Sequence, residues 1–210
     1  MIAVENIELY RYEIHSLLKA FYPQETVKVF VGEPDVRKYP EPAFLRVCFE
    51  NDHIDMTILP ADQPAVTKSV QAPEGIVYNE KSTECKTAAK HLLYEMLCAH
   101  TGTTLPWGEL IGIRPTKIAM TRLKEGDSVE EAALFMEREH LVSSEKATLA
   151  ADIADRERRI LSDIHYEDGY SLYVGIPFCP TTCLYCSFTS FPLSSWKARV
   201  DAYLDTLEQI

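Results

Sequence analysis

Three closely spaced cysteines that follow an apolar run constrain the fold of this chain most strongly. Cys179, Cys183 and Cys186 have the spacing C-x3-C-x2-C. The preceding run, Tyr170–Ile176, is rich in aromatic and β-branched residues and predicts a strand that is buried on both faces. A helix is expected to begin at residue 194 or 195, with an apolar stripe made of Trp196, Val200, Tyr203, Leu204 and Leu207. The order strand, ligand loop, helix predicts one βα unit.

The three thiols suit a [4Fe–4S] cluster, because cysteine thiolates are the usual ligands of such clusters. Three cysteines on one short loop can reach three of the four irons, so the fourth iron has no protein ligand. An open coordination position is where a metal centre can bind a reactant. The alternative is a structural zinc site with a fourth ligand such as His165. Zinc loops usually pair cysteines as C-x2-C with a distant second pair, which this sequence lacks.

The net charge and the distribution of cysteines restrict the expected binding partners and cellular location. The formal net charge of −11 disfavours nucleic acid and anionic membranes as partners, because phosphate binding needs a basic face. The start of the chain, Met1–Glu5, lacks the basic and apolar regions of a signal peptide, and no apolar run is long enough to span a bilayer. Three of the six cysteines crowd into one segment, which indicates metal binding in a cytoplasmic protein.

Residues 1–80 are predicted to form a small α+β domain. Apolar residues at helical spacing predict a helix that Pro23 ends, and alternating residues predict a strand around Lys28 and a hairpin that turns at Asn51 and Asp52. The helix positions are Tyr10, Ile14, Leu17, Leu18 and Phe21, and the hairpin positions are Leu45, Val47, Phe49, Ile54, Met56 and Ile58. We expect helices on one face of a small antiparallel sheet.

Residues 81–165 are predicted to form a helical region. Ser82 can cap a helix that ends at Gly102, and Ser128 with Glu131 fits a capping box. A further helix is expected from about Ser144 to Ile164, with an inner side made of Leu149, Ile153, Ile160 and Leu161. The alternating charges from Asp155 to Arg159 predict a solvated face. The remaining histidines have no metal-ligand spacing, and Cys48, Cys85 and Cys98 are expected to be small buried residues.

The cysteine spacing resembles the signature of the radical S-adenosylmethionine superfamily. The wider string Leu172–Cys179 (LYVGIPFC), followed by Cys186–Phe188 (CSF), resembles the oxygen-independent coproporphyrinogen III oxidase group and, most closely, its HemZ-type branch. That branch has a long N-terminal extension, and Pro106–Lys117 (PWGELIGIRPTK) resembles its second landmark. These segments identify the chain as similar to the N-terminal portion of such a protein.

The resemblance implies a [4Fe–4S] cluster and S-adenosyl-L-methionine as cofactors. It implies oxidative decarboxylation of the propionates of coproporphyrinogen III to vinyl groups, started by a 5′-deoxyadenosyl radical, within porphyrin and haem biosynthesis. The expected partners are a tetrapyrrole substrate and an electron donor of unknown identity. No catalytic side chain is assigned, since the bond breaking belongs to the cofactor.

The resemblance also carries two cofactor-binding residues. Tyr173, six residues before Cys179, matches a tyrosine that contacts S-adenosylmethionine, and Tyr185 matches an aromatic residue that lies against the adenosyl group. The chain departs from the best-studied branch after Cys186, where Ser187–Phe188 replaces a glycine and an additional cysteine. That departure leaves cluster binding untouched and bears on the porphyrinogen substrate.

The length of the chain predicts an incomplete barrel. A full eightfold barrel takes about 250 residues, whereas residues 166–210 hold one βα unit. The expected fold class is therefore α+β and α/β, with a small N-terminal α+β unit, a helical middle region and the first unit of a truncated radical SAM partial barrel. We expect residues 1–210 alone to lack turnover.

Two other functions and one other site stay open at this point. A sister branch resembles a haem chaperone that keeps the cluster motif but delivers haem, although that branch lacks a long extension. Residues 1–165 could instead be an interaction module that recruits a partner. Arg114–Lys117, at a helix start, could hold a substrate carboxylate, but an ordinary helix start with solvated cations is preferred.

Overall fold

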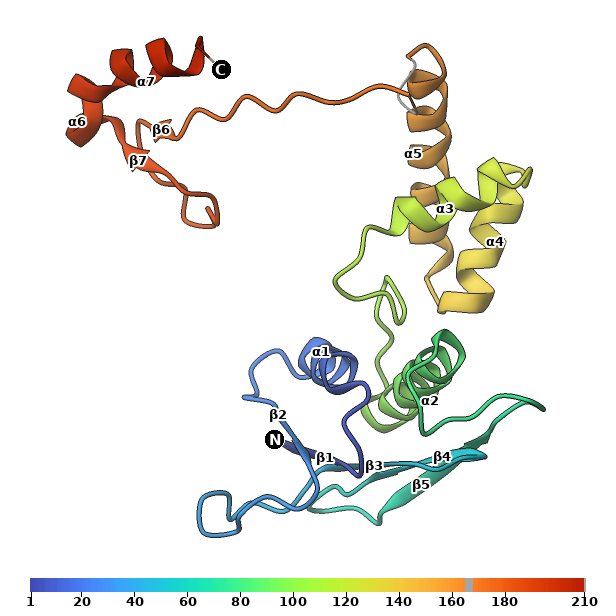
Figure 1. Cartoon of the computed structure of the whole chain (residues 1–210). Helices are drawn as coiled ribbons and strands as arrows, with labels where there is room; N and C mark the ends of the chain where they lie inside the picture. Colours follow the sequence, from blue (N-terminus) through green and yellow to red (C-terminus); the bar gives the residue numbers. More distant parts are fainter. Residues whose placement is uncertain (165–167, 210) are drawn as a thin grey trace. The chain divides into compact units, whose positions relative to one another are not determined.

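The first part of the chain forms a five-stranded sheet (Figure 1). In this computed structural model, residues 1–164 and 168–209 are described. The strands are β1 (Ile2–Glu5), β2 (Lys28–Val31), β3 (Leu45–Phe49), β4 (His53–Ile58) and β5 (Val66–Gln71), in the order β2-β1-β3-β4-β5. The predicted hairpin is confirmed, since β3 and β4 are antiparallel and Leu45 pairs with Ile58.

The sheet is mixed, so the expectation of an antiparallel sheet is wrong. Strand β1 runs parallel to both β2 and β3, and the residue pattern did not predict it. All four residues of β1 are buried, as in an interior parallel strand, so it shows no alternation of apolar and polar residues. Strand β5 also lacked a signal, because five of its six residues are exposed.

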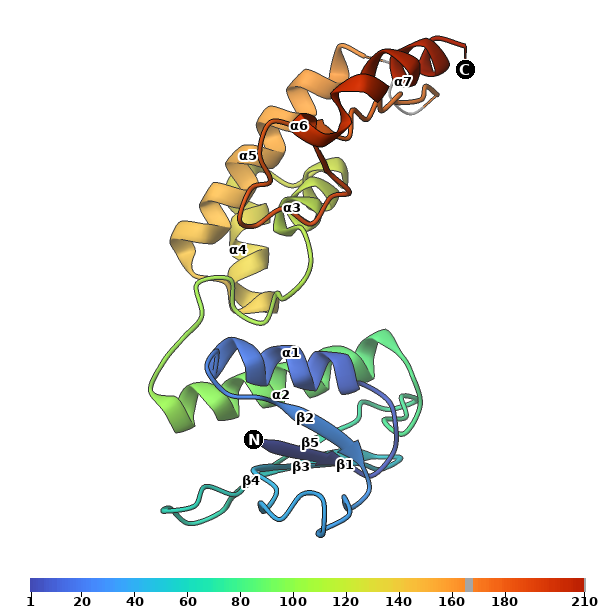
Figure 2. The same ribbon diagram turned by 90° about the vertical axis from the view of Figure 1, so that its left-hand side faces the viewer.

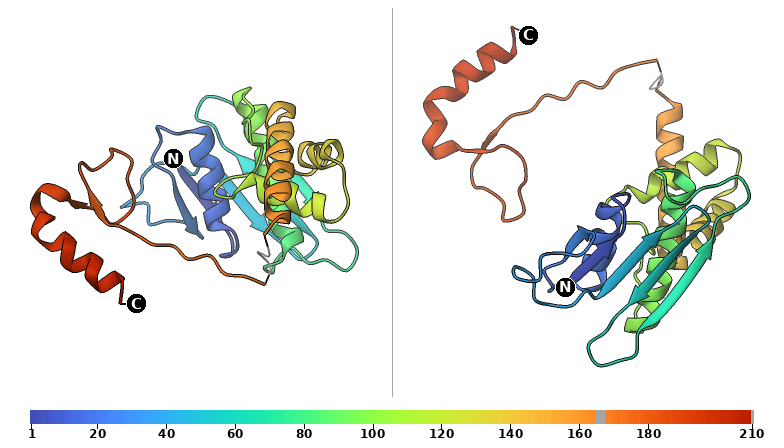
Figure 3. Two further views of the ribbon diagram at one scale, coloured as in Figure 1. Left: turned by 90° about the horizontal axis from the view of Figure 1, so that it is seen from above. Right: turned by 60° about the horizontal axis from the view of Figure 1, so that its bottom comes forward.

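Helices α1 (Arg11–Phe21) and α2 (Thr83–Thr101) cover one face of the sheet (Figure 2). The predicted ends of α2 are confirmed, because the Ser82 hydroxyl accepts a hydrogen bond from the backbone of Cys85 and Gly102 adopts a left-handed conformation. Apolar side chains of both helices and of the inner sheet face form one core. Helix α2 therefore packs with the sheet, although its residues fall within the predicted helical region. The opposite sheet face comes forward in the right-hand view of Figure 3.

Three further helices, α3 (Pro115–Lys124), α4 (Val129–His140) and α5 (Ser144–Ser162), share a second core. The predicted capping box is confirmed, since the side chains of Ser128 and Glu131 each bond the backbone amide of the other residue. The predicted helix starts at Pro115 and Ser144 are also present.

The predicted inner side of α5 is wrong. Leu149 is 44% exposed and Ile160 is 68% exposed, while the buried face consists of Ala147, Ala150, Ala151, Ala154 and Asp155. Alanine lets helices approach closely, so this small-residue stripe packs on α3 and α4 in place of the larger residues. The carboxylate of Asp155 is buried and pairs with Arg158 and Arg159, so this part of the predicted solvated face is wrong as well.

The chain divides into two compact units, Met1–Asp163 and Ile164–Ile210. In the second unit, β6 (Phe178–Cys179) pairs in parallel with β7 (Phe191–Pro192). A helical run follows, made of α6 (Leu193–Trp196), a 3₁₀ turn (Lys197–Arg199) and α7 (Val200–Leu207), so the predicted helix is confirmed. His165, named above as a possible fourth zinc ligand, lies outside the described residues.

The predicted buried strand Tyr170–Ile176 is wrong in this structure. Tyr170 is 92% exposed and Leu172 is 79% exposed, and among the described residues no strand pairs with this segment. A buried parallel strand requires neighbours on both sides, and the described part of the chain supplies none there. The fold is thus α+β with a mixed sheet. None of the helices in the described ranges is long and apolar enough to cross a membrane.

Candidate metal centre

The three cysteines lie on a loop whose two ends are joined by the β6–β7 pair. Cys179 is the last residue of β6 and pairs with Pro192, while the backbone amide of Phe191 donates to the carbonyl of Pro177 at 2.7 Å. The thiols are all free; those of Cys179 and Cys186 are on half-buried residues, and Cys183 is exposed. The loop therefore presents its thiols for ligation with none consumed by a disulfide.

A tight turn links the second and third cysteines. The backbone amide of Cys186 donates to the carbonyl of Cys183 at 3.0 Å, and the Cys186 thiol lies 3.8 Å from the carbonyl oxygen of Phe188. This turn fixes the backbone between two of the three predicted ligands.

The donor set fits a [4Fe–4S] cluster in its chemistry, since thiolates are the usual ligands of such a cluster and three free thiols lie on one solvent-accessible loop. The structure does not gather them into a finished site. Across residues 1–164 and 168–209, no group of three or more His, Cys, Asp or Glu side chains is arranged to hold a metal ion. The metal ligands therefore stay a prediction based on residue type and spacing.

The two predicted cofactor-binding tyrosines are exposed. Tyr173 is 87% exposed on the extended segment before β6, and Tyr185 is 90% exposed between Cys183 and Cys186. Neither ring is committed to a core, so both are available for a ligand. Their contact with S-adenosylmethionine stays a prediction.

A curated relative aligns with part of the chain. The chain is 37% identical over 126 residues to the oxygen-independent coproporphyrinogen-III oxidase-like protein HemZ of Bacillus subtilis (strain 168). This similarity supports the predicted resemblance to HemZ-type proteins. The match covers 60% of this chain and 25% of the relative, so the aligned part spans about a quarter of the HemZ length. No family model matches the chain. No solved structure matches it either.

The unit Met1–Asp163 contains an ionic cluster that residue spacing did not predict. Glu109 is 2% exposed, and its carboxylate lies 3.6 Å from the ammonium group of Lys90, 3.7 Å from Nδ1 of His91 and 3.2 Å from Nδ1 of His140. The second carboxylate oxygen, Oε2, accepts no hydrogen bond from the described residues. Histidine spacing could not reveal this cluster, because its members come from three separate segments.

The predicted landmark Pro106–Lys117 has a structural role in this chain. Gly108 has a φ of +56°, and a Cβ atom there would lie 2.1 Å from the carbonyl oxygen of His140. Only glycine fits such a close backbone approach. Arg114 and Lys117 are exposed at the start of α3, and no side chain caps that helix start. Substrate binding by these two cations stays untested.

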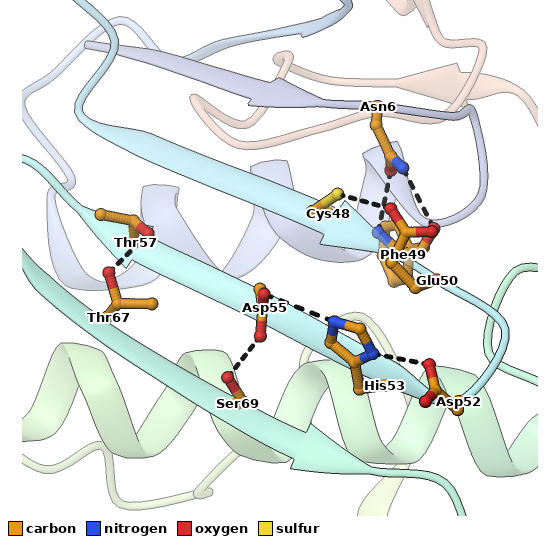
Figure 4. Close-up of polar contacts among 10 residues, drawn as sticks. All are labelled: Asn6, Cys48, Phe49, Glu50, Asp52, His53, Asp55, Thr57, Thr67 and Ser69. Carbon is orange, nitrogen blue, oxygen red and sulfur yellow. Dashed lines mark hydrogen bonds and ion pairs between the residues drawn. The ribbon is translucent and has the colours of Figure 1, made fainter.

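Polar side chains also cluster on the sheet face opposite α1 and α2 (Figure 4). His53 lies 2.7 Å from Asp52 and 3.5 Å from Asp55, which also accepts from Ser69. The hydrogen bond with Asp52 raises the pKa of His53 and lowers that of Asp52. Burial raises the pKa of Cys48 to about 11, so its thiol stays protonated at neutral pH. These contacts join neighbouring strands and indicate a structural network.

Proposed function

We propose that this chain is part of a radical SAM oxidoreductase that converts propionates of coproporphyrinogen III to vinyl groups without oxygen. The observation that carries the proposal is the set of three free thiols at C-x3-C-x2-C in a chain 37% identical to an oxygen-independent coproporphyrinogen-III oxidase-like protein. Because the chain spans about a quarter of that relative, the activity is proposed for the whole protein.

In this proposal Cys179, Cys183 and Cys186 each bind one iron and leave the fourth iron open for S-adenosyl-L-methionine. When bound, the cluster and S-adenosylmethionine would supply the one-electron chemistry that removes a hydrogen atom from a substrate propionate, which then loses carbon dioxide and a further electron. Tyr173 and Tyr185, both exposed, would contact the S-adenosylmethionine. The protein's own task is to hold these groups and to exclude competing reactions.

The proposed partners are a tetrapyrrole substrate and a one-electron donor. The net charge of −11 suits neither nucleic acid nor an anionic membrane, which favours a small-molecule substrate. A tetrapyrrole with several carboxylates would need a local cationic site, and the exposed pair Arg114 and Lys117 is one candidate.

Anaerobic reconstitution of the full-length protein with iron and sulfide tests the proposal. We expect about four irons per chain and an electron paramagnetic resonance spectrum of the reduced cluster that changes when S-adenosylmethionine is added. Cys183→Ser should abolish the signal. The control Cys98→Ser should keep it, because Cys98 lies on α2 in the other unit.

Three outcomes would reject the proposal. Zinc in the purified protein would indicate a structural site, and a spectrum unchanged by S-adenosylmethionine would indicate a closed cluster. Stoichiometric haem binding with no decarboxylation would indicate a haem-delivering protein with the same motif.

A further inference from the structure

Backbone pairing at the ends of the cysteine loop is short. Strands β6 and β7 each contain two residues, below the usual strand length of about 3–10 residues. A ladder this short supplies few hydrogen bonds, so side chains must help to fix where the loop begins and ends. Aromatic residues from the following helical run make those contacts.

Tyr203 of α7 anchors the segment that enters the loop. Its hydroxyl donates a hydrogen bond of 2.6 Å to the carbonyl of Gly175. Its ring meets the ring of Phe178 edge-on, with centroids 5.3 Å apart and an angle of 89° between the planes. Phe178 directly precedes Cys179, so one side chain holds two points of the backbone that leads to the first cysteine.

Trp196 of α6 anchors the segment that leaves the loop. Its ring lies 4.7 Å from the ring of Phe191, which is in β7. The guanidinium group of Arg199 lies 5.9 Å from the centroid of the same Trp196 ring, within cation–π range. Both ends of the loop are therefore held by residues that follow it in the chain.

The Tyr203 hydroxyl adds a directional constraint to the ring contacts. An open pocket of about 300 Å³ is lined by Phe178, Phe191, Trp196 and Tyr203. A hydrogen bond restricts both the distance and the angle between its donor and acceptor, which an edge-on ring contact does less strictly. The Tyr203 hydroxyl therefore sets the distance between α7 and Gly175.

We propose that Tyr203 is a positioning residue that fixes the backbone before Cys179 and so sets how the first cysteine is presented to a metal. The proposal rests on the proposed function for the role of the cysteines, but the contact itself can be tested without a cluster. Tyr203 does not touch the metal and is not a ligand in this scheme.

The test uses full-length apoprotein and site-resolved alkylation by iodoacetamide, measured by mass spectrometry. In Tyr203→Phe, which keeps the ring and removes the hydroxyl, Cys179 should react on the order of fivefold faster, the change expected from the loss of one hydrogen bond. Cys183, which is already exposed, should react at the wild-type rate. The control Tyr12→Phe, at a side chain that is 66% exposed in the other unit, should change neither rate.

A second measurement follows the reconstituted cluster. Iron loss to a chelator should be faster in Tyr203→Phe by a similar factor, while the melting temperature stays at the wild-type value. An unchanged rate at Cys179, or equal acceleration at all three cysteines together with a lower melting temperature, would overturn the positioning role. If wild-type protein binds no cluster, the proposed function fails, and the alkylation result still decides the role of Tyr203.

Discussion

Nδ1 of His140 lies 3.2 Å from the carboxylate of Glu109, which joins the end of α4 to the segment after α2. The backbone repeats this link, because the amide of Glu109 donates to the carbonyl of His140 at 3.1 Å. Lys90 and His91 approach the same carboxylate from α2. One buried acid therefore connects the core of the sheet with the three-helix core.

Replacement of Glu109 should lower the stability of the fold. Glu109→Gln removes the charge that Lys90, His91 and His140 share, and loss of one member of a buried ion pair should lower the free energy of unfolding by about 2–4 kcal/mol. Urea unfolding followed by circular dichroism measures the change. Glu145→Gln, at an 84% exposed carboxylate beside Lys146, is the matched control and should cost less than about 0.5 kcal/mol. Equal effects of the two variants would contradict a central role for Glu109.

Two buried tyrosine hydroxyls should respond in opposite ways to removal. The Tyr10 hydroxyl accepts from the amide of Ser82 at 2.9 Å and donates to its carbonyl at 2.8 Å, whereas the hydroxyl of Tyr22 is buried without a partner in the described residues. Tyr10→Phe should destabilise the chain by about 1–2 kcal/mol, and Tyr22→Phe should be neutral or stabilising. Thermal unfolding of both variants tests this. A larger loss for Tyr22→Phe would show that its hydroxyl has a partner.

The buried Glu5 predicts a pH-dependent stability. Burial raises its pKa above the ordinary value of 4.5, although Arg11 at 3.9 Å opposes the shift. Folding favours the protonated form of Glu5. The contribution of the protonated acid to stability is therefore complete below pH 4.5 and is lost as the pH rises through the higher pKa of the folded state. Glu5→Gln should be more stable than wild type at pH 7, because the amide carries no charge into the buried position.

Urea unfolding at several pH values measures this difference, which should shrink as the pH falls toward 4.5. The control is Glu8→Gln, because Glu8 faces the same Arg11 at 3.5 Å but is 64% exposed. A difference between Glu5→Gln and wild type that is constant with pH would exclude titration of Glu5 as its source.

The alanine face of α5 should not tolerate larger residues. Ala151 is fully buried, so Ala151→Leu should overpack the three-helix core and cost about 1–3 kcal/mol. Leu149→Ala, on a nearby exposed position, should cost less than about 1 kcal/mol. Chemical unfolding of both variants makes the comparison. A larger loss of stability for Leu149→Ala than for Ala151→Leu would instead support the predicted inner face of leucine and isoleucine residues.

Sequence patterns within a few residues predicted the secondary-structure elements in which those patterns occur. The hairpin around Asn51 and the capping box at Ser128 follow from alternation and from capping chemistry within a few residues, and both are present. Strand β1 carries no such alternation, because all four of its residues are buried between two parallel neighbours. In α5 the alanines also recur at helical spacing, and a rule that seeks large apolar residues selected the wrong stripe.

At the candidate site, too, local sequence predicts some features, and others depend on the tertiary fold. The spacing of Cys179, Cys183 and Cys186 predicts a ligand loop, because that information is contained in eight consecutive residues, and the ligand role stays a prediction. The hydrogen bond from Tyr203 to Gly175 and the cluster around Glu109 depend on the tertiary fold, which residue spacing does not encode. The exposed run Tyr170–Ile176 was predicted as buried because its composition describes a strand with partners on both sides.

The position of β1 between β2 and β3 affects how the sheet can assemble during synthesis. Strand β1 stays unpaired until Lys28–Val31 has followed it, and its second partner is complete only at Phe49. Deletion of residues 2–5 would separate β2 from the rest of the sheet, because β2 reaches β3 only through β1. These four residues therefore connect edge strand β2 to the β3–β4–β5 hairpins. A variant that lacks them should expose the core of the sheet.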